Sequence, residues 1–308
     1  MDSTTITYSP LSVTIPTPDV SLHRFTPFSS PPPASRPALI KSLLTSSPQL
    51  SRSVGCLVGL AVGDFLGAPM EFLPLSAASL PNPPHFDAAT FEHRNTPPDR
   101  FSLETGQWTD DTSMSMCLAD GLIENEGAYV GSLIRTKYWL WWNVGLNNSF
   151  RKSAGRPRHS VGLGGNIKQS LDSIAPLSPP TNDYKPPGRS QDAGNGSLMR
   201  LAPISICFHR SQWSAMAMAK QSSSATHPGP MAADACAFLS FVLVKAIDGR
   251  GAETVKCFLD DCRAEFLDCH AVTVCDEVRR LVRAEEPGGG TESVWNWREE
   301  KLPIEEVR

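Results

Sequence analysis

The chain has 308 residues and a mass of 33.4 kDa, enough for one large domain or two ordinary ones with a substantial core. Its 28 Lys and Arg and 32 Asp and Glu give a formal charge of −4 and a pI of about 6.0. This balance argues against a dedicated nucleic-acid-binding protein, which usually carries a basic excess. The longest apolar stretches, around residues 54–70 and 235–247, are short or interrupted by Asp64 and Lys245, so we expect no membrane span.

Residues 1–50 differ in composition from the rest of the chain, because Ser, Thr and Pro make up about half of them. Such a segment buries too little apolar surface to offset its ordering entropy. We therefore expect a disordered tail over residues 1–50 and one domain over residues 51–308. The first residues lack the basic region and apolar core of a secretory signal. We expect a cytoplasmic or nuclear protein, and the Ser-rich start leaves a mitochondrial location open.

From residue 51 onwards, apolar residues recur at helical spacing, with Ser51 or Ser53 available as an N-cap. The same periodicity predicts further helices over residues 110–122, 130–144, 197–208, 212–222, 229–247, 252–266 and 271–284. Alternating runs of β-branched residues are scarce, and residues 80–106 and 150–191 are long segments rich in Pro and Gly. The pattern predicts an all-α domain with long surface loops.

Eight cysteines are present without any C-x-x-C pair, and most of them lie among apolar residues. We interpret them as reduced, buried thiols of an intracellular protein. A zinc site built from Cys257, Cys262, Cys269 and His270 is a minor alternative.

The segment Thr109-Asp110-Asp111-Thr112 allows two interpretations. It is typical of a helix start, with Thr109 as the N-cap and acidic residues in the first turn. It also presents carboxylate and hydroxyl oxygens together, which are the ligands that Mg²⁺ or Ca²⁺ requires, and adjacent carboxylates favour a neutralising cation.

A second segment surrounds Glu71. Pro69 should end the preceding helix, which leaves Glu71 on a loop where it could face a cleft or simply be solvated. A third segment, Gly194-Asn195-Gly196, precedes an apolar run. It is either a plain turn or a site where free amides bind a pyrophosphate, and the segment from Gly162 to Asn166 is a similar candidate. His227, before a proline, is by default a loop histidine.

Together these segments resemble the ADP-ribosylglycohydrolase family. The matching stretches are G-x-x-x-G-L-A-V-G-D-F-L-G-A-P-M-E-F from Gly55, W-T-D-D-T-S-M from Trp108, G-N-G-S-L-M-R from Gly194 and T-H-P-G-P from Thr226. Their order and spacing agree with the family over residues 51–294. The resemblance implies an all-α domain of orthogonally packed helices, with two Mg²⁺ ions in a cleft.

The resemblance also implies roles for residues that match the motifs. Thr109, Asp110 and Asp111 would be metal ligands, and Glu71 would be a metal ligand or the catalytic base. The substrate would be an ADP-ribosylated protein or an ADP-ribose derivative. The residues that would contact it are Asp192, Ala193, Gly194, Asn195, Gly196 and His227. The implied reaction is Mg²⁺-dependent hydrolysis of the bond between ADP-ribose and a protein side chain or small molecule, without nucleic-acid or membrane partners.

One feature departs from the family. No late D-x-D-[T/S] motif, which supplies further metal ligands, follows Val294. We expect either a truncated or a degenerate member, which would bind Mg²⁺ weakly and hydrolyse little. The alternative function is therefore a non-catalytic ADP-ribose-binding or crystallin-like structural protein.

Overall fold

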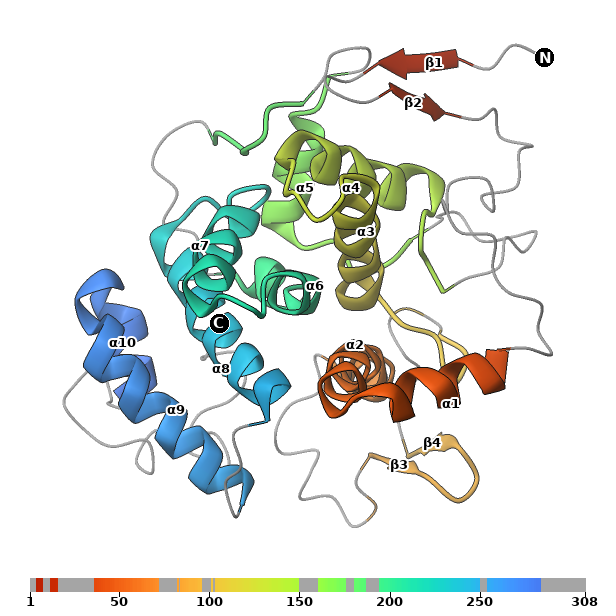
Figure 1. The fold of residues 1–308 in the computed structure, drawn as a ribbon. Coiled ribbons are helices and arrows are strands. Elements are labelled where there is room, and N and C mark those ends of the chain that lie inside the picture. The colour runs from red at the N-terminus through yellow and green to blue at the C-terminus, as the bar shows by residue number, and fades with distance from the viewer. Residues whose placement is uncertain are drawn as a thin grey trace.

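The computed structural model describes residues 4–7, 12–15, 36–71, 82, 84–95, 101, 103–149, 160–175, 180–186, 194–249 and 254–283. Within these residues the protein is predominantly helical, which confirms the all-α prediction (Figure 1). The α-helices are α1 (Arg36–Ser46), α2 (Pro48–Gly67), α3 (Asp110–Glu124), α4 (Gly131–Val144), α5 (Gly165–Asp172), α6 (Ala202–Cys207), α7 (Gln212–Ser223), α8 (Pro230–Asp248), α9 (Val255–His270) and α10 (Asp276–Arg283). The 3₁₀ turns are η3 (Ala68–Met70), η5 (Asn195–Ser197) and η6 (Ala271–Thr273).

Short strands accompany the helices. Strand β1 (Thr4–Thr7) pairs antiparallel with β2 (Ser12–Ile15), and β3 (His85–Asp87) pairs antiparallel with β4 (Glu92–Arg94). The second hairpin lies in the loop expected over residues 80–106, where three-residue strands are too short for an alternating pattern to reveal them. Phe86 on β3 packs edge-on against Phe65 of α2, with ring centroids 5.5 Å apart, which explains why the hairpin sits beneath this helix (Figure 1).

Helical structure begins earlier in the chain than the boundary predicted at residue 51. Helix α1 and the start of α2 fall within residues 1–50, as do the strands β1 and β2. Ser47, rather than Ser51 or Ser53, is the N-cap of α2: its hydroxyl accepts a hydrogen bond from the Leu50 N–H at 3.0 Å, and a proline follows it at the first helical position. Ser51 and Ser53 lie within the helix.

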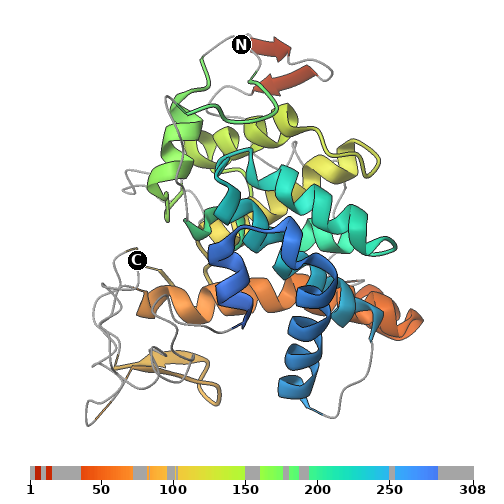
Figure 2. The same ribbon diagram turned by 90° about the vertical axis from the view of Figure 1, so that its left-hand side faces the viewer.

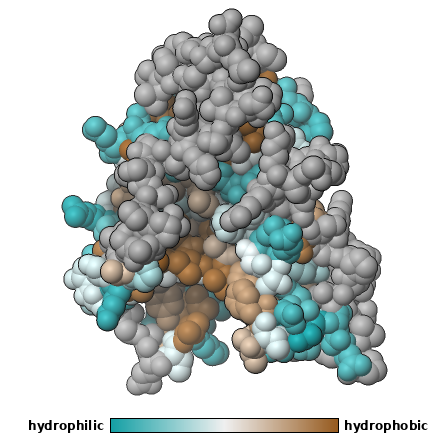
Figure 3. All heavy atoms as spheres, turned by 90° about the vertical axis from the view of Figure 1, so that its right-hand side faces the viewer, coloured by the Kyte–Doolittle hydropathy of each residue, from teal (hydrophilic) through white to brown (hydrophobic). Residues whose placement is uncertain are grey.

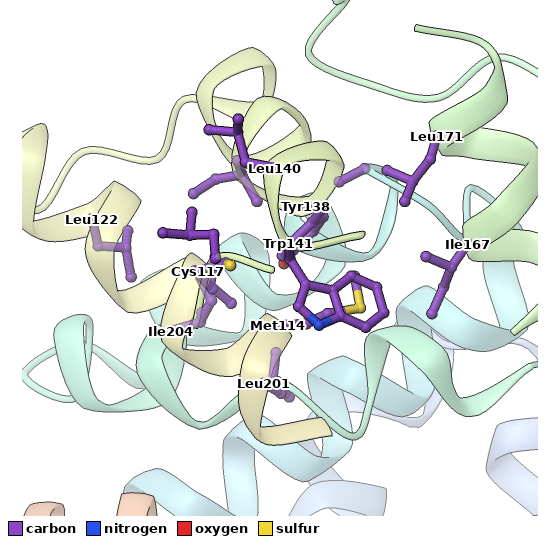
Figure 4. Packing of buried hydrophobic residues seen from close by; sticks show 14 of the residues in the cluster. Met114, Cys117, Leu122, Tyr138, Leu140, Trp141, Ile167, Leu171, Leu201 and Ile204 are labelled. Carbon is purple, nitrogen blue, oxygen red and sulfur yellow. The ribbon is translucent and has the colours of Figure 1, made fainter. Parts of the chain in front are cut away.

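The larger hydrophobic cluster lies between α3, α4, α5 and α6. Tyr138 and Trp141 of α4 meet Met114 and Cys117 of α3 there, with Ile204 from α6 (Figure 4). All five side chains are at most 1 % exposed. Helix α5 was not expected, because it lies in the segment predicted as a loop, but Ile167 and Leu171 bury its apolar side in this cluster.

A second hydrophobic cluster joins α7, α8, α9 and α10. Phe241 of α8 and Phe266 of α9 are fully buried in it, with ring centroids 5.3 Å apart. Helix α8 borders both clusters, because Cys236 belongs to the first and Ala237 to the second. The two clusters thus meet along α8, and α9 and α10 lie at the end of the molecule away from α4 and α5 (Figures 1 and 2).

The cysteines are all unpaired thiols, as predicted. Their burial was predicted less well, since Cys117, Cys236 and Cys262 are buried while Cys207, Cys257 and Cys269 are exposed. Within the described part of the chain, no three His, Cys, Asp or Glu side chains form a ready metal site, so the zinc alternative lacks support there.

Helix α2 differs from the other long helices in its surroundings. By length and composition, both the stretch Pro48–Met70 and helix α8 are apolar enough to cross a membrane, although no membrane span was predicted from the sequence. Half of α8 is buried within the protein, whereas only 11 % of the α2 stretch is, and Leu57, Val58 and Val62 are exposed on it. Helix α8 is therefore a core helix. Apolar side chains also gather in a hollow on the face of the molecule shown in Figure 3.

Candidate functional site

The candidate site begins where α2 ends against α3. Asp64, in the last turn of α2, is one of only two side chains that the described structure buries on that helix. Its carboxylate accepts hydrogen bonds from the Thr109 N–H (3.0 Å) and hydroxyl (2.8 Å), and from the Thr112 N–H (3.0 Å) and hydroxyl (2.8 Å). These bonds satisfy amides that a helix start leaves without partners.

This arrangement corrects the predicted cap of α3. Thr109 occupies the N-cap position, but its side chain makes no capping hydrogen bond. Instead, the Asp64 carboxylate, 45 residues earlier in the chain, caps the helix. The Thr109 hydroxyl donates to Asp64, so its oxygen lone pairs remain available as acceptors.

The two aspartates at the start of α3 are crowded by other negative charges. Asp110 is 9 % exposed, and burial raises its pKa well above the usual range; the charges of Asp111, Asp64 and Glu71 raise it further. Burial, followed by the charges of Asp64 and Glu71, raises the pKa of Asp111 to about 7. Burial and repulsion among these carboxylates favour binding of a cation at this helix start.

Glu71 lies where the sequence placed it, directly after the helix that Pro69 ends. Helix α2 stops at Gly67, one 3₁₀ turn follows, and Glu71 adopts an extended backbone with an exposed side chain. Its charge raises the pKa of both Asp110 and Asp111, so it lies on the same side of the molecule as the start of α3. The charge of Glu71 thus acts on the two aspartates, but within the described residues the three carboxylates do not form one metal-binding group.

The glycine segment before α5 contacts the acidic residues directly. Gly162 has a φ of +85°, and a Cβ atom there would lie 2.1 Å from the Asp110 Oδ1 atom. Only glycine therefore fits at this position. Five residues later, Ile167 contacts Gly196, because a Cβ on Gly196 would meet its Cδ1 atom at 3.0 Å. The segment from Gly162 to Ile167 links the acidic residues to the second glycine turn.

The turn Gly194-Asn195-Gly196 is partly exposed and partly buried. Gly194 and Asn195 are exposed, Gly196 is buried, and the turn continues as η5 rather than as the helix predicted over residues 197–208. Helix α6 begins only at Ala202. Asp192 and Ala193 lie outside the described residues.

Arg200 supports this turn from inside the protein. It is 1 % exposed, donates to the Gly196 carbonyl at 2.9 Å and to the Thr226 hydroxyl at 2.7 Å, and its guanidinium lies 4.5 Å from the centroid of the Tyr138 ring. All these partners are neutral, and Arg200 forms no ion pair with the carboxylates of the described residues. A buried cation without a counter-ion creates a positive potential beneath the turn.

His227 lies against the same turn. It is 2 % exposed, and a Cβ on Gly196 would lie 2.6 Å from its Cε1 atom, so the ring packs against the glycine. Burial and the nearby Arg200 charge lower the pKa of His227 to about 3, so the ring is neutral at physiological pH. The structure thus places His227 inside the protein rather than on an open loop.

Asp64, Thr112 and Arg200 were not among the predicted site residues. Asp64 and Arg200 lie within the quoted motifs, and the signal for each was a charged side chain within an apolar stretch. Thr112 gave no separate signal, because its hydroxyl acquires its partner only through the contact between α2 and α3.

The chain is similar to known proteins along most of its length. A family model described as ADP-ribosylglycohydrolase matches residues 45–304. ADP-ribosylarginine hydrolase Tri1 of Serratia proteamaculans is 30 % identical over 246 residues, which cover 80 % of this chain and 59 % of that protein. The ADP-ribosyl-dinitrogen reductase glycohydrolase of Rhodospirillum rubrum is 27 % identical, with 67 % of this chain and 61 % of that protein covered.

A solved structure described as an ADP-ribosylglycohydrolase-related protein complex has the same fold, with a TM-score of 0.53 and 24 % identity over 79 % of this chain and 72 % of the other. The chain spans less than two thirds of the length of the curated relatives it matches. The family model, however, covers most of the chain, including each segment of the candidate site. The chain belongs to the ADP-ribosylglycohydrolase family.

Proposed function

We propose that the protein acts on ADP-ribose attached to a protein side chain or small molecule, as a Mg²⁺-dependent hydrolase of the glycosidic bond. The observation that carries this proposal is the juxtaposition of two sites of opposite charge: the acidic start of α3 and the glycine turn above the buried Arg200. ADP-ribose presents hydroxyl groups at one end and a pyrophosphate in the middle, so both sites have a matching group on one ligand.

The donors at the start of α3 suit a hard cation. Asp110 and Asp111 offer carboxylate oxygens and Thr109 offers a hydroxyl oxygen, which are ligands that Mg²⁺ prefers. When bound, the ion would act as a Lewis acid and a template for the ribose hydroxyls. The raised pKa of Asp110 and Asp111 supports the fit, since burial and neighbouring negative charges disfavour both carboxylates and a bound cation would offset this.

The chain's own residues would position the substrate and move one proton. Backbone amides of the exposed turn at Gly194 and Asn195, above the positive potential of Arg200, would hold the pyrophosphate, so that binding energy remote from the scissile bond orients the ribose. Glu71 would take a proton from the attacking water as positive charge develops on the ribose. The exposure of Glu71 leaves room for that water.

ADP-ribosylarginine is the first substrate to test, because the relatives from Serratia proteamaculans and Pseudomonas putida are named ADP-ribosylarginine hydrolases. We would incubate the chain with an arginine-ADP-ribosylated peptide and measure released ADP-ribose, with and without Mg²⁺. Release that requires Mg²⁺ and is lost in Asp111→Asn would support the proposal. No release, with peptide and ADP-ribose both bound, would contradict it.

The second candidate is a non-catalytic ADP-ribose-binding or structural protein. One observation favours it: the described residues hold no group of three His, Cys, Asp or Glu side chains that could bind a metal ion. Thermal stabilisation by free ADP-ribose without hydrolysis would identify a binding protein, and the absence of both would identify a structural one.

A further inference from the structure

Asp64 is an unusual residue for its position in the fold. Helix α2 is apolar and has only two buried residues, and one of them is a carboxylate near its end that packs against another helix. A buried carboxylate is costly unless hydrogen bonds satisfy it. Here the described residues that donate hydrogen bonds to the Asp64 carboxylate are two threonines in or just before the first turn of α3.

The direction of these bonds determines what Thr109 can do. A carboxylate can only accept, so the proton of the Thr109 hydroxyl points to Asp64 Oδ1, 2.8 Å away. The lone pairs of the same oxygen then point elsewhere. The Thr109 N–H is held by the same carboxylate, so the backbone and the hydroxyl are fixed together. Asp110 and Asp111 follow directly on this fixed backbone.

We propose that Asp64 is a positioning residue that turns the Thr109 hydroxyl into a pure acceptor and presents it, with the carboxylates of Asp110 and Asp111, to a divalent cation. This inference rests on the proposed metal dependence. Asp64 itself is engaged by hydrogen bonds from the threonines on both of its oxygens and acts through Thr109. Residues that orient a metal ligand typically change metal affinity about 10- to 100-fold when they are replaced.

Thr112 provides a matched control within the same contact. Its hydroxyl also donates to Asp64 at 2.8 Å, and it is as buried as Thr109, at 4 % exposure. Loss of the Thr112 hydroxyl weakens the contact between α2 and α3 but leaves the Thr109 hydroxyl bound to Asp64. A merely structural role for the contact predicts similar effects for both threonines, whereas a positioning role predicts a difference.

The experiment is a titration of the full chain with Tb³⁺, a hard cation that prefers oxygen ligands. Binding is measured as Tb³⁺ luminescence on excitation of tryptophan, because Trp108 is next to Thr109 in the chain. Asp64→Asn replaces one acceptor oxygen with an N–H donor that cannot accept from either threonine. We expect it to weaken Tb³⁺ binding about 10- to 100-fold, and Thr112→Val to weaken it by less than about threefold. In a Thr109→Val background, Asp64→Asn should have almost no further effect.

The proposal would be overturned if Asp64→Asn lowered Tb³⁺ affinity equally in the unaltered chain and in the Thr109→Val background. It would also be overturned if Thr112→Val lowered Tb³⁺ affinity as much as Asp64→Asn does, or if the unaltered chain bound no Tb³⁺. If circular dichroism shows that Asp64→Asn does not fold, Thr109→Ser and Thr109→Val test the proposal instead. Thr109→Ser should retain its affinity for Tb³⁺, and Thr109→Val should bind Tb³⁺ about tenfold more weakly. Failure of ADP-ribose release with these affinities intact would reject the proposed reaction and leave the role of Asp64 standing.

Discussion

The start of α3 and the surroundings of Arg200 are neighbouring regions with opposite electrostatics. At the start of α3, burial and the negative charges of Asp64 and Glu71 raise the pKa of both Asp110 and Asp111. Around Arg200, a buried cation meets only neutral groups, and the pKa of His227 falls. The two regions meet at Met114, whose sulfur lies 3.9 Å from the Arg200 Nη1 atom.

The difference between the two regions indicates which charged residues stabilise the fold and which take part in the reaction. Each region holds a charge that the fold does not neutralise, so each can lower its free energy by binding an ion of the opposite sign. Arg200, however, is held by hydrogen bonds inside the core, whereas Glu71 is exposed on a loop. Substitutions should therefore affect stability in the Arg200 region and reaction in the acidic region.

Glu71→Gln, in the acidic region, is expected to have the largest effect, and that effect should be on the reaction and not on binding. The variant should bind ADP-ribose almost as tightly as the unaltered chain, while ADP-ribose release falls by about 10²–10⁴, the usual contribution of a general base. Single-turnover kinetics and ADP-ribose calorimetry measure the two effects. Glu104→Gln, an exposed glutamate on the loop before α3, is the control and should change neither. An equal loss of binding and turnover would assign Glu71 a binding role.

Arg200→Leu should instead act on stability. It leaves the Gly196 carbonyl and the Thr226 hydroxyl without their donor inside the core, and we expect the free energy of unfolding to fall by about 3 kcal/mol. Urea denaturation measures the change. Arg94→Leu, which removes an exposed arginine paired with Glu92 at 2.8 Å, should cost less than about 1 kcal/mol. Similar losses for both arginines would show that Arg200 is not central to the core.

Gly162→Ala tests the close contact between Gly162 and the Asp110 carboxylate, which links the two regions. Its methyl group would collide with the Asp110 carboxylate, in addition to the strain of a positive φ, which is about 1–2 kcal/mol. Gly106 has a similar φ, +87°, with nothing within 4 Å of the added atom. Gly106→Ala therefore reports strain alone. Only Gly162→Ala should also weaken Tb³⁺ binding, and unchanged Tb³⁺ binding in that variant would contradict the contact.

The smallest expected effect is on pH dependence, and the two regions should differ in its sign. The pKa of Asp111 is raised in the folded state to about 7, so folding favours its protonated form, and its contribution to stability is lost as the pH rises from about 4 to about 7. His227 has a lowered pKa of about 3, so its contribution is present above about pH 6.5 and is lost as the pH falls towards 3.

The measurement is the melting temperature between pH 4 and pH 8, without divalent cations, for the unaltered chain, Asp111→Asn and His227→Gln. The melting temperature of Asp111→Asn should exceed that of the unaltered chain most at neutral pH. On acidification, the melting temperature of His227→Gln should fall less than that of the unaltered chain. The same slope in all three proteins would show that neither group titrates abnormally.

The sequence predicted the helices best where the apolar period is long and the ends carry standard signals. Helix α7 was expected over residues 212–222 and is observed over Gln212–Ser223; α8 was expected over residues 229–247 and is observed over Pro230–Asp248. The motifs also located Glu71, Thr109, Asp110 and Asp111 correctly at the end of one helix and the start of another. These features are local, since they depend on residues within a few positions of one another.

The tertiary structure decided how these pieces act on one another. The sequence could not show that Asp64 caps α3, because that bond joins residues 45 positions apart and requires α2 to pack against α3. Nor could it show that Gly162 contacts Asp110, or that Arg200 is buried in the core with hydrogen bonds to the Gly196 carbonyl and the Thr226 hydroxyl. Periodicity and motifs determined which side chains were available, whereas burial and long-range packing set their charge state and hydrogen-bond direction.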